Sequence, residues 1–217
     1  LVPAGTKPDD LAAGDFDRDG DVDLAVCDRE VNGLVRFLRN DGSGALAALG
    51  STSVGDKPAA VVAADLDRDG DLDLAVANDD SNDVSILFGN GLGGFTAQAT
   101  LALGSGDTSP VSLAVGDFNA DDAPDLVAAS FGDDTLHVYR NLGAGAFAAP
   151  GLFNAPTLLL HVAVADVNRD GRPDLVAAAG GLSVFRGRGG LDFDPPESVV
   201  AGFSPQGLAV GDFDRDG

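Results

Sequence analysis

The sequence predicts an all-β protein built from four-stranded antiparallel units, and three observations carry this prediction. A nine-residue acidic motif, Asp-x-(Asp/Asn)-x-Asp-(Gly/Asp)-x-x-Asp, starts at positions 15, 65, 117 and 166, and a truncated copy starts at 212. Short apolar runs bounded by turn residues flank each copy of the motif. No stretch of the chain shows the 3.6-residue periodicity of an amphipathic helix.

The first strand of each unit is expected just before the motif. Its apolar run ends in Gly or Ala and covers residues 11–14, 61–64, 113–116, 162–165 and 208–211. Runs of this length are too short for helices and are typical of strands. The small residue before each motif predicts that these strands crowd around a central axis.

Three further strands are expected after the motif in each unit. The second covers residues 24–27, 74–77, 126–129 and 175–178, and the third covers 34–38, 84–88, 136–139 and 182–185. A Gly-rich turn follows, as in 89–95 and 141–147, and a fourth strand such as 95–103 closes the unit. Residues 89–94 resemble a phosphate-binding loop, but strands on both sides predict a hairpin turn instead.

The repeat period favours a β-propeller, or a segment of one, over a helical solenoid. Successive motifs start 50, 52, 49 and 46 residues apart, which is typical of a four-stranded blade. We expect one propeller region over residues 1–217, with repeats at 8–57, 58–109, 110–158 and 159–204 and a partial fifth at 205–217. Both ends fall inside a unit, so we expect further blades or another chain to close the ring.

The charge of the chain narrows its possible partners. The formal net charge is −22, and about half of the 35 acidic residues lie at ligand positions of the repeated motif. A polyanion would be repelled, so we expect no nucleic-acid partner. No apolar run is long enough to cross a bilayer, so we expect no membrane insertion. The single cysteine, Cys27, is expected to be a small buried thiol.

The motif has the ligand chemistry of a calcium site. Calcium takes about six to eight oxygen ligands in a flexible geometry. In a tight loop the first, third and fifth side chains converge, the seventh residue offers its backbone carbonyl, and the ninth closes the site. The expected ligands are Asp15, Asp17, Asp19, Asp21 and Asp23; Asp65, Asp67, Asp69, Asp71 and Asp73; Asp117, Asn119, Asp121, Ala123 and Asp125; Asp166, Asn168, Asp170, Arg172 and Asp174; and, in the truncated fifth copy, Asp212, Asp214 and Asp216. We expect about one Ca²⁺ per complete loop, four in all.

The copies differ in ways that predict unequal sites. Gly at the sixth position permits a positive φ at the turn, whereas the third loop has Asp122 there and one carboxylate fewer than the first two. We therefore expect the third loop to be the weakest complete site. The second position is always apolar (Phe16, Leu66, Phe118, Val167 and Phe213) and is expected to anchor each loop in the core. The alternative is an acidic turn that binds no metal.

The motif, the Asp-Leu strand after it and the Asn-x-Gly-x-Gly-x-Phe turn of residues 141–147 together resemble the FG-GAP/VCBS repeat family. The resemblance covers essentially the whole chain. It implies a calcium-binding propeller like that of integrin α-subunits, which has seven blades, and a secreted or cell-surface location. It also implies a partner that is an extracellular protein or a glycan.

Other side chains give little sign of catalysis. His137 and His161 are the main acid–base candidates, but they fall on different strand types and neither recurs. Arg18, Arg68, Arg169 and Arg215 occupy the fourth loop position, where we expect exposed charge compensation. We expect a non-catalytic, calcium-stabilised binding or scaffold module. One alternative is a carbohydrate-binding propeller or an accessory domain of a secreted enzyme, and the absence of Trp and the single Tyr139 make sugar binding less favoured. The other alternative is a catalytic propeller.

Overall fold

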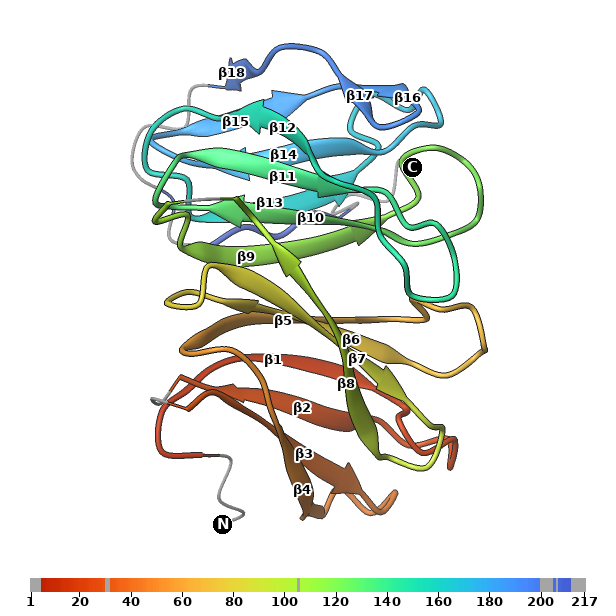
Figure 1. Ribbon diagram of the computed structural model, residues 1–217. Coiled ribbons are helices and arrows are strands. Elements are labelled where there is room, and N and C mark those ends of the chain that lie inside the picture. Colours follow the sequence, from red (N-terminus) through yellow and green to blue (C-terminus); the bar gives the residue numbers. More distant parts are fainter. Residues whose placement is uncertain (1–4, 30–31, 105, 200–204, 206, 212–217) are drawn as a thin grey trace.

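Four antiparallel sheets of four strands each follow one another along the chain, as the computed structural model shows (Figure 1). The structure describes residues 5–29, 32–104, 106–199, 205 and 207–211. Strands and turns make up these residues, and none of them is helical. The all-β fold with propeller blades is therefore confirmed.

Each sheet is a blade in which consecutive strands pair in sequence order. Blade one contains β1 (Pro8–Gly14), β2 (Asp23–Asp28), β3 (Leu34–Asn40) and β4 (Leu46–Ser53). Blade two contains β5 (Pro58–Ala64), β6 (Asp73–Asn78), β7 (Asp83–Gly89) and β8 (Phe95–Ala102). Blade three contains β9 (Pro110–Gly116), β10 (Asp125–Ser130), β11 (Thr135–Tyr139) and β12 (Gly151–Asn154).

Blade four has an interrupted outer hairpin. Its sheet contains β13 (His161–Ala165), β14 (Asp174–Ala178), β15 (Leu182–Phe185) and β18 (Glu197–Val199), and a separate hairpin of β16 (Gly187–Gly189) and β17 (Asp192–Phe193) lies between the last two. Gly189, Gly190 and Leu191 all have positive φ, which places the turn of this hairpin between β16 and β17. The third strand ends at Phe185, as the sequence predicted for residues 182–185, whereas the extra hairpin that follows Arg186 was not predicted.

The first strands of the blades lie innermost and contact one another in the order β1, β5, β9 and β13. Small residues at their ends permit this approach. A methyl group on Gly14 would lie 2.6 Å from Leu72 Cδ1, and one on Gly116 would lie 2.8 Å from Val164 Cγ1. The predicted crowding is present, and it comes from side chains of the following blade.

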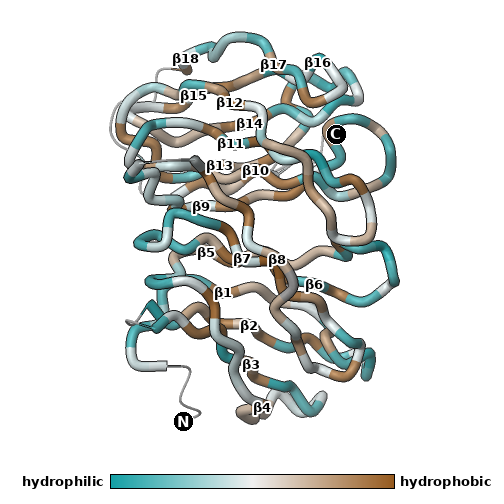
Figure 2. Tube along the Cα trace, in the orientation of Figure 1, coloured by the Kyte–Doolittle hydropathy of each residue, from teal (hydrophilic) through white to brown (hydrophobic). Residues whose placement is uncertain are grey.

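The core consists of three apolar clusters, each between two successive blades. Cys27 and Val35 of blade one pack in a cluster with Leu74 of blade two. Leu66 and Tyr139 belong to the next cluster, between blades two and three. Hydrophobic residues follow the strands, and hydrophilic residues gather in the loops at their ends (Figure 2). Each blade therefore depends on its neighbour to bury its apolar face, and Cys27 is a buried thiol as predicted.

The apolar second residue of the loop faces the following blade. Phe16, Leu66 and Phe118 are buried, with 4%, 0% and 3% of their surface exposed. The prediction is wrong for Val167, which is 47% exposed. Its counterparts are covered by the next blade, and after blade four the structure describes only residues 205 and 207–211. The strand predicted at 208–211 does not form there, so that prediction is wrong. Phe213 lies outside the described residues, and the predicted repeat boundaries stay a prediction.

Candidate metal centre

The acidic loops connect the first and second strands of their blades, at residues 15–22, 65–72, 117–124 and 166–173. In all four, the first Asp organises the loop by accepting two backbone hydrogen bonds. Its Oδ1 accepts the N–H of the fifth residue at 3.1 Å. Its Oδ2 accepts the N–H of the sixth residue at 2.7–3.0 Å. The motif thus specifies a loop of the same local geometry four times.

Two positions in each loop have left-handed backbone conformations. The sixth residue has positive φ as predicted, with 62° at Asp122 where the other loops have Gly. The fourth residue is also left-handed, and the sequence prediction missed it: Arg18, Arg68, Ala120 and Arg169 have φ of 59–68°. Arg and Ala have no preference for this conformation, so residue type carried no signal.

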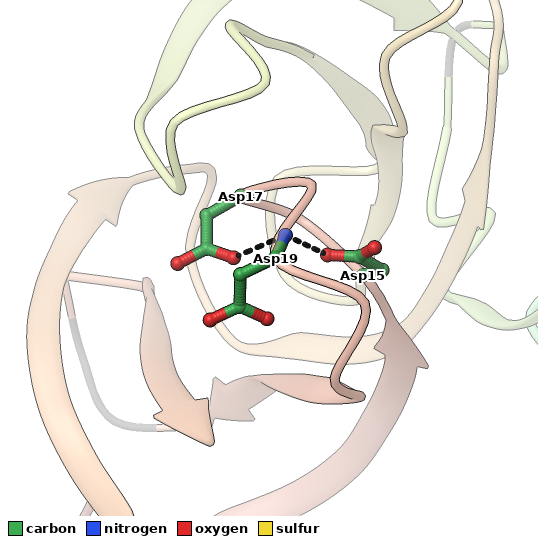
Figure 3. A group of neighbouring side chains, drawn as sticks. All are labelled: Asp15, Asp17 and Asp19. Carbon is green, nitrogen blue, oxygen red and sulfur yellow. Dashed lines mark hydrogen bonds between the residues drawn. The ribbon is translucent and has the colours of Figure 1, made fainter. Parts of the chain in front are cut away.

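Carboxylates converge most clearly in the first two loops. Oxygen atoms of Asp15, Asp17 and Asp19 all lie within 4.8 Å of one another (Figure 3). Asp65, Asp67 and Asp73 form a second trio with the same property. Like charges this close repel one another strongly. Hard cations prefer such oxygen donors, so the donor set fits calcium.

The ninth-position Asp connects the loop to its blade through hydrogen bonds, in addition to any role as a metal ligand. Asp23 is 3% exposed, and Asp73, Asp125 and Asp174 are fully buried. One carboxylate oxygen accepts the N–H of the second loop residue at 2.7–3.1 Å. The other accepts a backbone N–H from the last residue of the third strand, or from the second residue after it, at 2.7–2.9 Å. The sequence had assigned these residues only to closing the metal site.

Burial and neighbouring charges shift the pKa values of the loop carboxyls in different directions. Burial raises the pKa of Asp73 and of Asp125 to about 6. Burial, with Coulomb repulsion from Asp69 and Asp65, raises the pKa of Asp67. The pKa of Asp19 is lowered, chiefly by a hydrogen bond from Arg39. The second loop therefore holds its negative charge at a higher free-energy cost than the first.

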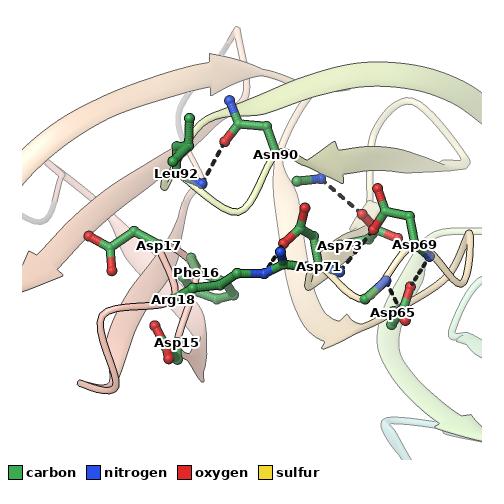
Figure 4. Close-up of polar contacts among 12 residues, drawn as sticks. Asp15, Phe16, Asp17, Arg18, Asp65, Asp69, Asp71, Asp73, Asn90 and Leu92 are labelled. Carbon is green, nitrogen blue, oxygen red and sulfur yellow. Dashed lines mark hydrogen bonds and ion pairs between the residues drawn. The ribbon is translucent and has the colours of Figure 1, made fainter.

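Arginines contact the loops from two directions. Arg39, at the end of β3, pairs with Asp17 at 2.7 Å and with Asp19 at 3.0 Å. Arg18, at the fourth position of loop one, pairs across the blade boundary with Asp71 of loop two (Figure 4). The fourth-position arginines were expected only to compensate charge. Arg18 also joins two blades, and Arg215 lies outside the described residues.

The oxygen atoms that could coordinate a cation differ in the third and fourth loops. The amide oxygen of Asn119, at the third position of loop three, is buried and has no hydrogen-bond partner. An unpartnered buried oxygen beside Asp117 and Asp121 fits a cation site. Asp166, Asn168 and Asp170 of loop four are all exposed. Asp212, Asp214 and Asp216 lie outside the described residues, and the individual ligand assignments stay predictions.

A polar cavity of about 800 Å³ lies where the inner strands begin, away from the acidic loops. Arg29 lines it and pairs with Asp9 at 2.8 Å and with Asp79 at 2.5 Å. His161 and Phe131 also line it, and the Phe131 side chain is 42% exposed. The other histidine, His137, is buried on β11, with Nε2 3.5 Å from Asp133 Oδ2. The two histidines thus belong to separate environments.

The sequence profile of the FG-GAP-like repeat matches three overlapping segments, residues 15–76, 65–128 and 117–177. Each match starts at the first Asp of a loop and ends in the second strand of the next blade. Among curated proteins, none matches the sequence. Within the described residues, no helix has the length and hydrophobicity that a membrane crossing requires.

Solved structures share the fold at low sequence identity. A protein from Lactobacillus plantarum aligns over 94% of this chain with a TM-score of 0.67 and 16% identity. BBS1N, solved in complex with ARL6DN and soaked with lead, aligns over 88% with a TM-score of 0.58 and 17% identity. An Agrocybe aegerita lectin that recognises non-reducing terminal N-acetylglucosamine aligns over 86% with a TM-score of 0.59 and 20% identity. The chain spans 59%, 51% and 50% of these three chains.

Proposed function

The chain belongs to the FG-GAP-like repeat family, and from this premise we propose that it is a calcium-stabilised, non-catalytic binding module that acts outside the cell. The observation that carries the proposal is the convergence of three carboxylates in each of the first two loops. The buried, unpartnered oxygen of Asn119 supports a similar role for the third loop.

Calcium would act here on stability. Its positive charge would offset the repulsion among the carboxylates at positions one, three and five of the first two loops, and at positions one and five of the third and fourth. The loop is tied to the third strand through the ninth-position Asp, so an ion held in the loop would favour the folded blade. Extracellular calcium is abundant enough for sites of modest affinity. The secreted or cell-surface location is part of the proposal.

Thermal unfolding in calcium and in excess chelator tests the metal role. Binding only to the folded protein adds about 2.7 kcal/mol per site when free calcium is about 100 times Kd. We expect the melting temperature to fall clearly on chelation and to recover when calcium is restored in excess. Magnesium at the same ionic strength serves as a control for screening. A melting temperature that chelation leaves unchanged would refute the proposal.

The binding role is expected at the faces and edges of the blades, with an extracellular protein as the partner. Val167 on blade four is exposed where its counterparts are covered. We propose that a further blade, or another chain, covers this face. Light scattering combined with an apolar-to-charged change, Val167→Asp, would test it. A chain that is monomeric with or without this substitution would exclude pairing through Val167.

Carbohydrate binding is the second candidate, and the polar cavity lined by Arg29 favours it. Asp9, Asp79 and Arg29 supply fixed hydrogen-bond acceptors and donors, and Phe131 offers an exposed ring. Tyr139 is unsuitable as a stacking surface because it is buried and donates its hydroxyl to the Ala102 carbonyl at 3.1 Å.

Saturation-transfer NMR with N-acetylglucosamine, the sugar that the similar lectin recognises, tests this candidate. A signal lost in Phe131→Ala would support the cavity. A signal that Phe131→Ala retains but chelator removes would instead place the sugar on a metal site. Absence of any signal at millimolar sugar would argue against recognition of this sugar.

A further inference from the structure

One residue near the end of the third strand differs among the blades, and the difference alters the charge beside the acidic loop. A hydrogen bond that every blade makes identifies the equivalent position in the four blades. The backbone N–H of the next residue is donated to the ninth-position Asp: Asn40 to Asp23, Gly89 to Asp73, Asn141 to Asp125 and Gly187 to Asp174. The preceding residues are therefore equivalent, and they are Arg39, Phe88, Arg140 and Arg186.

In blade one this residue is a cation placed on the loop. Arg39 Nε lies 2.7 Å from Asp17 Oδ2, and its Nη2 lies 3.0 Å from Asp19 Oδ2. Both carboxylates belong to the trio with Asp15 that converges within 4.8 Å. One guanidinium thus bridges two of the three carboxylates, a geometry that suits its forked donors.

In blade two the equivalent residue carries no charge. Phe88 packs against the apolar cluster between blades two and three. Among the residues whose contacts are described, no basic side chain pairs with Asp65, Asp67 or Asp73. The second trio therefore has no basic partner of its own among these residues, and Arg18 pairs with Asp71 at the seventh position of that loop instead.

Blades three and four each carry an arginine at this position, but the two arginines have different partners. Arg140 Nη2 reaches Asp121 Oδ2 at 3.3 Å, a single and longer contact. Arg186 turns away from the loop and pairs with Glu197 at 2.8 Å. At this one position, blade one thus has a cation that bridges two loop carboxylates, and blade two has no cation. Blade three has a single, longer ion pair with its loop, and blade four has an arginine paired outside its loop.

We infer that Arg39 is a tethered counter-ion of the first loop, which competes with calcium for Asp17 and Asp19, whereas the second loop, beside Phe88, depends on the ion itself. The inference rests on the proposed calcium binding. The Arg39 side chain is 48% exposed, so it can move aside when an ion enters. Exposed ion pairs are individually weak, so the competition changes affinity by about three- to tenfold rather than abolishing binding.

Calorimetric titration of calcium into chelator-stripped protein tests this assignment in the wild type, Arg39→Ala and Arg39→Gln. Both variants should tighten one site by about three- to tenfold. Both should also melt at a lower temperature in chelator, because the loop has lost its counter-ion. Arg186→Ala is the matched control, since its partner is Glu197, and it should leave calcium affinity unchanged. In an Asp15→Asn background, which weakens the first loop, the gain from Arg39→Ala should disappear.

The reverse exchange tests the second loop. Phe88→Arg should weaken its calcium binding relative to Phe88→Leu, which controls for lost packing. Wild-type affinity, or weaker affinity, in both Arg39 variants would overturn the inference while leaving the proposed function intact. Failure of the wild type and of every variant to take up calcium would overturn the proposed function as well.

Discussion

Arg18 Nε lies 2.6 Å from Asp71 Oδ1, so the fourth residue of one acidic loop is paired with the seventh residue of the next. The Arg18 side chain is 57% exposed and the Asp71 side chain is 12% exposed. The turn of blade two also reaches back to blade one, where Gly93 donates its N–H to the Phe16 carbonyl at 2.9 Å. Loops that the sequence presents as separate units are therefore connected across the blade boundary.

A double-mutant cycle should measure this connection. Arg18→Ala, Asp71→Ala and the double variant should show a coupling of about 0.5–1 kcal/mol in urea unfolding, since one partner remains exposed to solvent. Arg68→Ala is the control, because Arg68 only approaches the Asp121 carbonyl, at 3.5 Å. Additive losses from the two single changes would show that the pair does not join the blades.

The buried ninth-position Asp should matter for stability even without metal. Asp125→Ala removes the acceptor for the N–H groups of Phe118 and Asn141, at 3.1 and 2.8 Å. Leaving such buried donors unpaired should cost about 2–4 kcal/mol of unfolding free energy in chelator. Asp192→Ala, at a side chain that is 67% exposed, serves as the control. A loss no larger than in this control would limit Asp125 to a ligand role.

The metal-free protein should respond to pH through Asp73 and Asp125. Their folded pKa of about 6 lies above the value of about 3.9 for an unfolded Asp. The folded state thus binds these protons more tightly, and their contribution to stability is full below about pH 4 and is lost as the pH rises through about 6. Carboxyl NMR titration in chelator should give midpoints near 6, and calcium should lower them. Midpoints near 4 in chelator would contradict the prediction.

Replacing Asp122 by Gly should stabilise the third loop. Asp122 has φ of 62°, and the equivalent residues of the other three complete loops are glycines. Relief of the left-handed strain, less the entropy that Gly adds to the unfolded chain, should give about 0.5 kcal/mol in urea unfolding. Gly20→Ala is the converse test. A methyl group there would meet no atom within 4 Å, so its expected loss of about 1–2 kcal/mol is a backbone effect. If Asp122→Gly instead lowers the free energy of unfolding, the interactions of the Asp122 side chain stabilise the loop by more than its backbone strain costs.

Adding a carboxylate to loop three should strengthen it as a cation site. Asn119→Asp supplies the charge that the first two loops have at this position, so calcium affinity should rise about tenfold or less. In chelator the variant should be less stable, because Asn119 Nδ2 no longer donates to Asp125 Oδ2 at 3.2 Å. Calcium titration and melting in chelator together check both effects. Unchanged affinity would remove Asn119 from the ligand set.

Much of the local structure followed from the chain itself. The strands of the four blade sheets, the Gly-rich hairpin turn at 89–94 and the positive φ of the sixth loop residue, Asp122 included, were predicted, whereas the β16–β17 hairpin was not. These features depend on residues a few positions apart, whose turn chemistry is repeated in every blade. The left-handed fourth residue could not be predicted, because neither Arg68 nor Ala120 favours that conformation by itself.

By itself, the sequence determined the repeating unit: a strand, an acidic loop closed by a buried Asp, and three further strands. Short-range hydrogen bonds and apolar patterning suffice for that. Only the tertiary structure decided which charges meet, as with Arg39 on Asp17 or Arg18 on Asp71, and which anchors are covered, as with Phe16 but not Val167. Those contacts join different strands or different blades, and their geometry depends on how the blades pack rather than on any single motif.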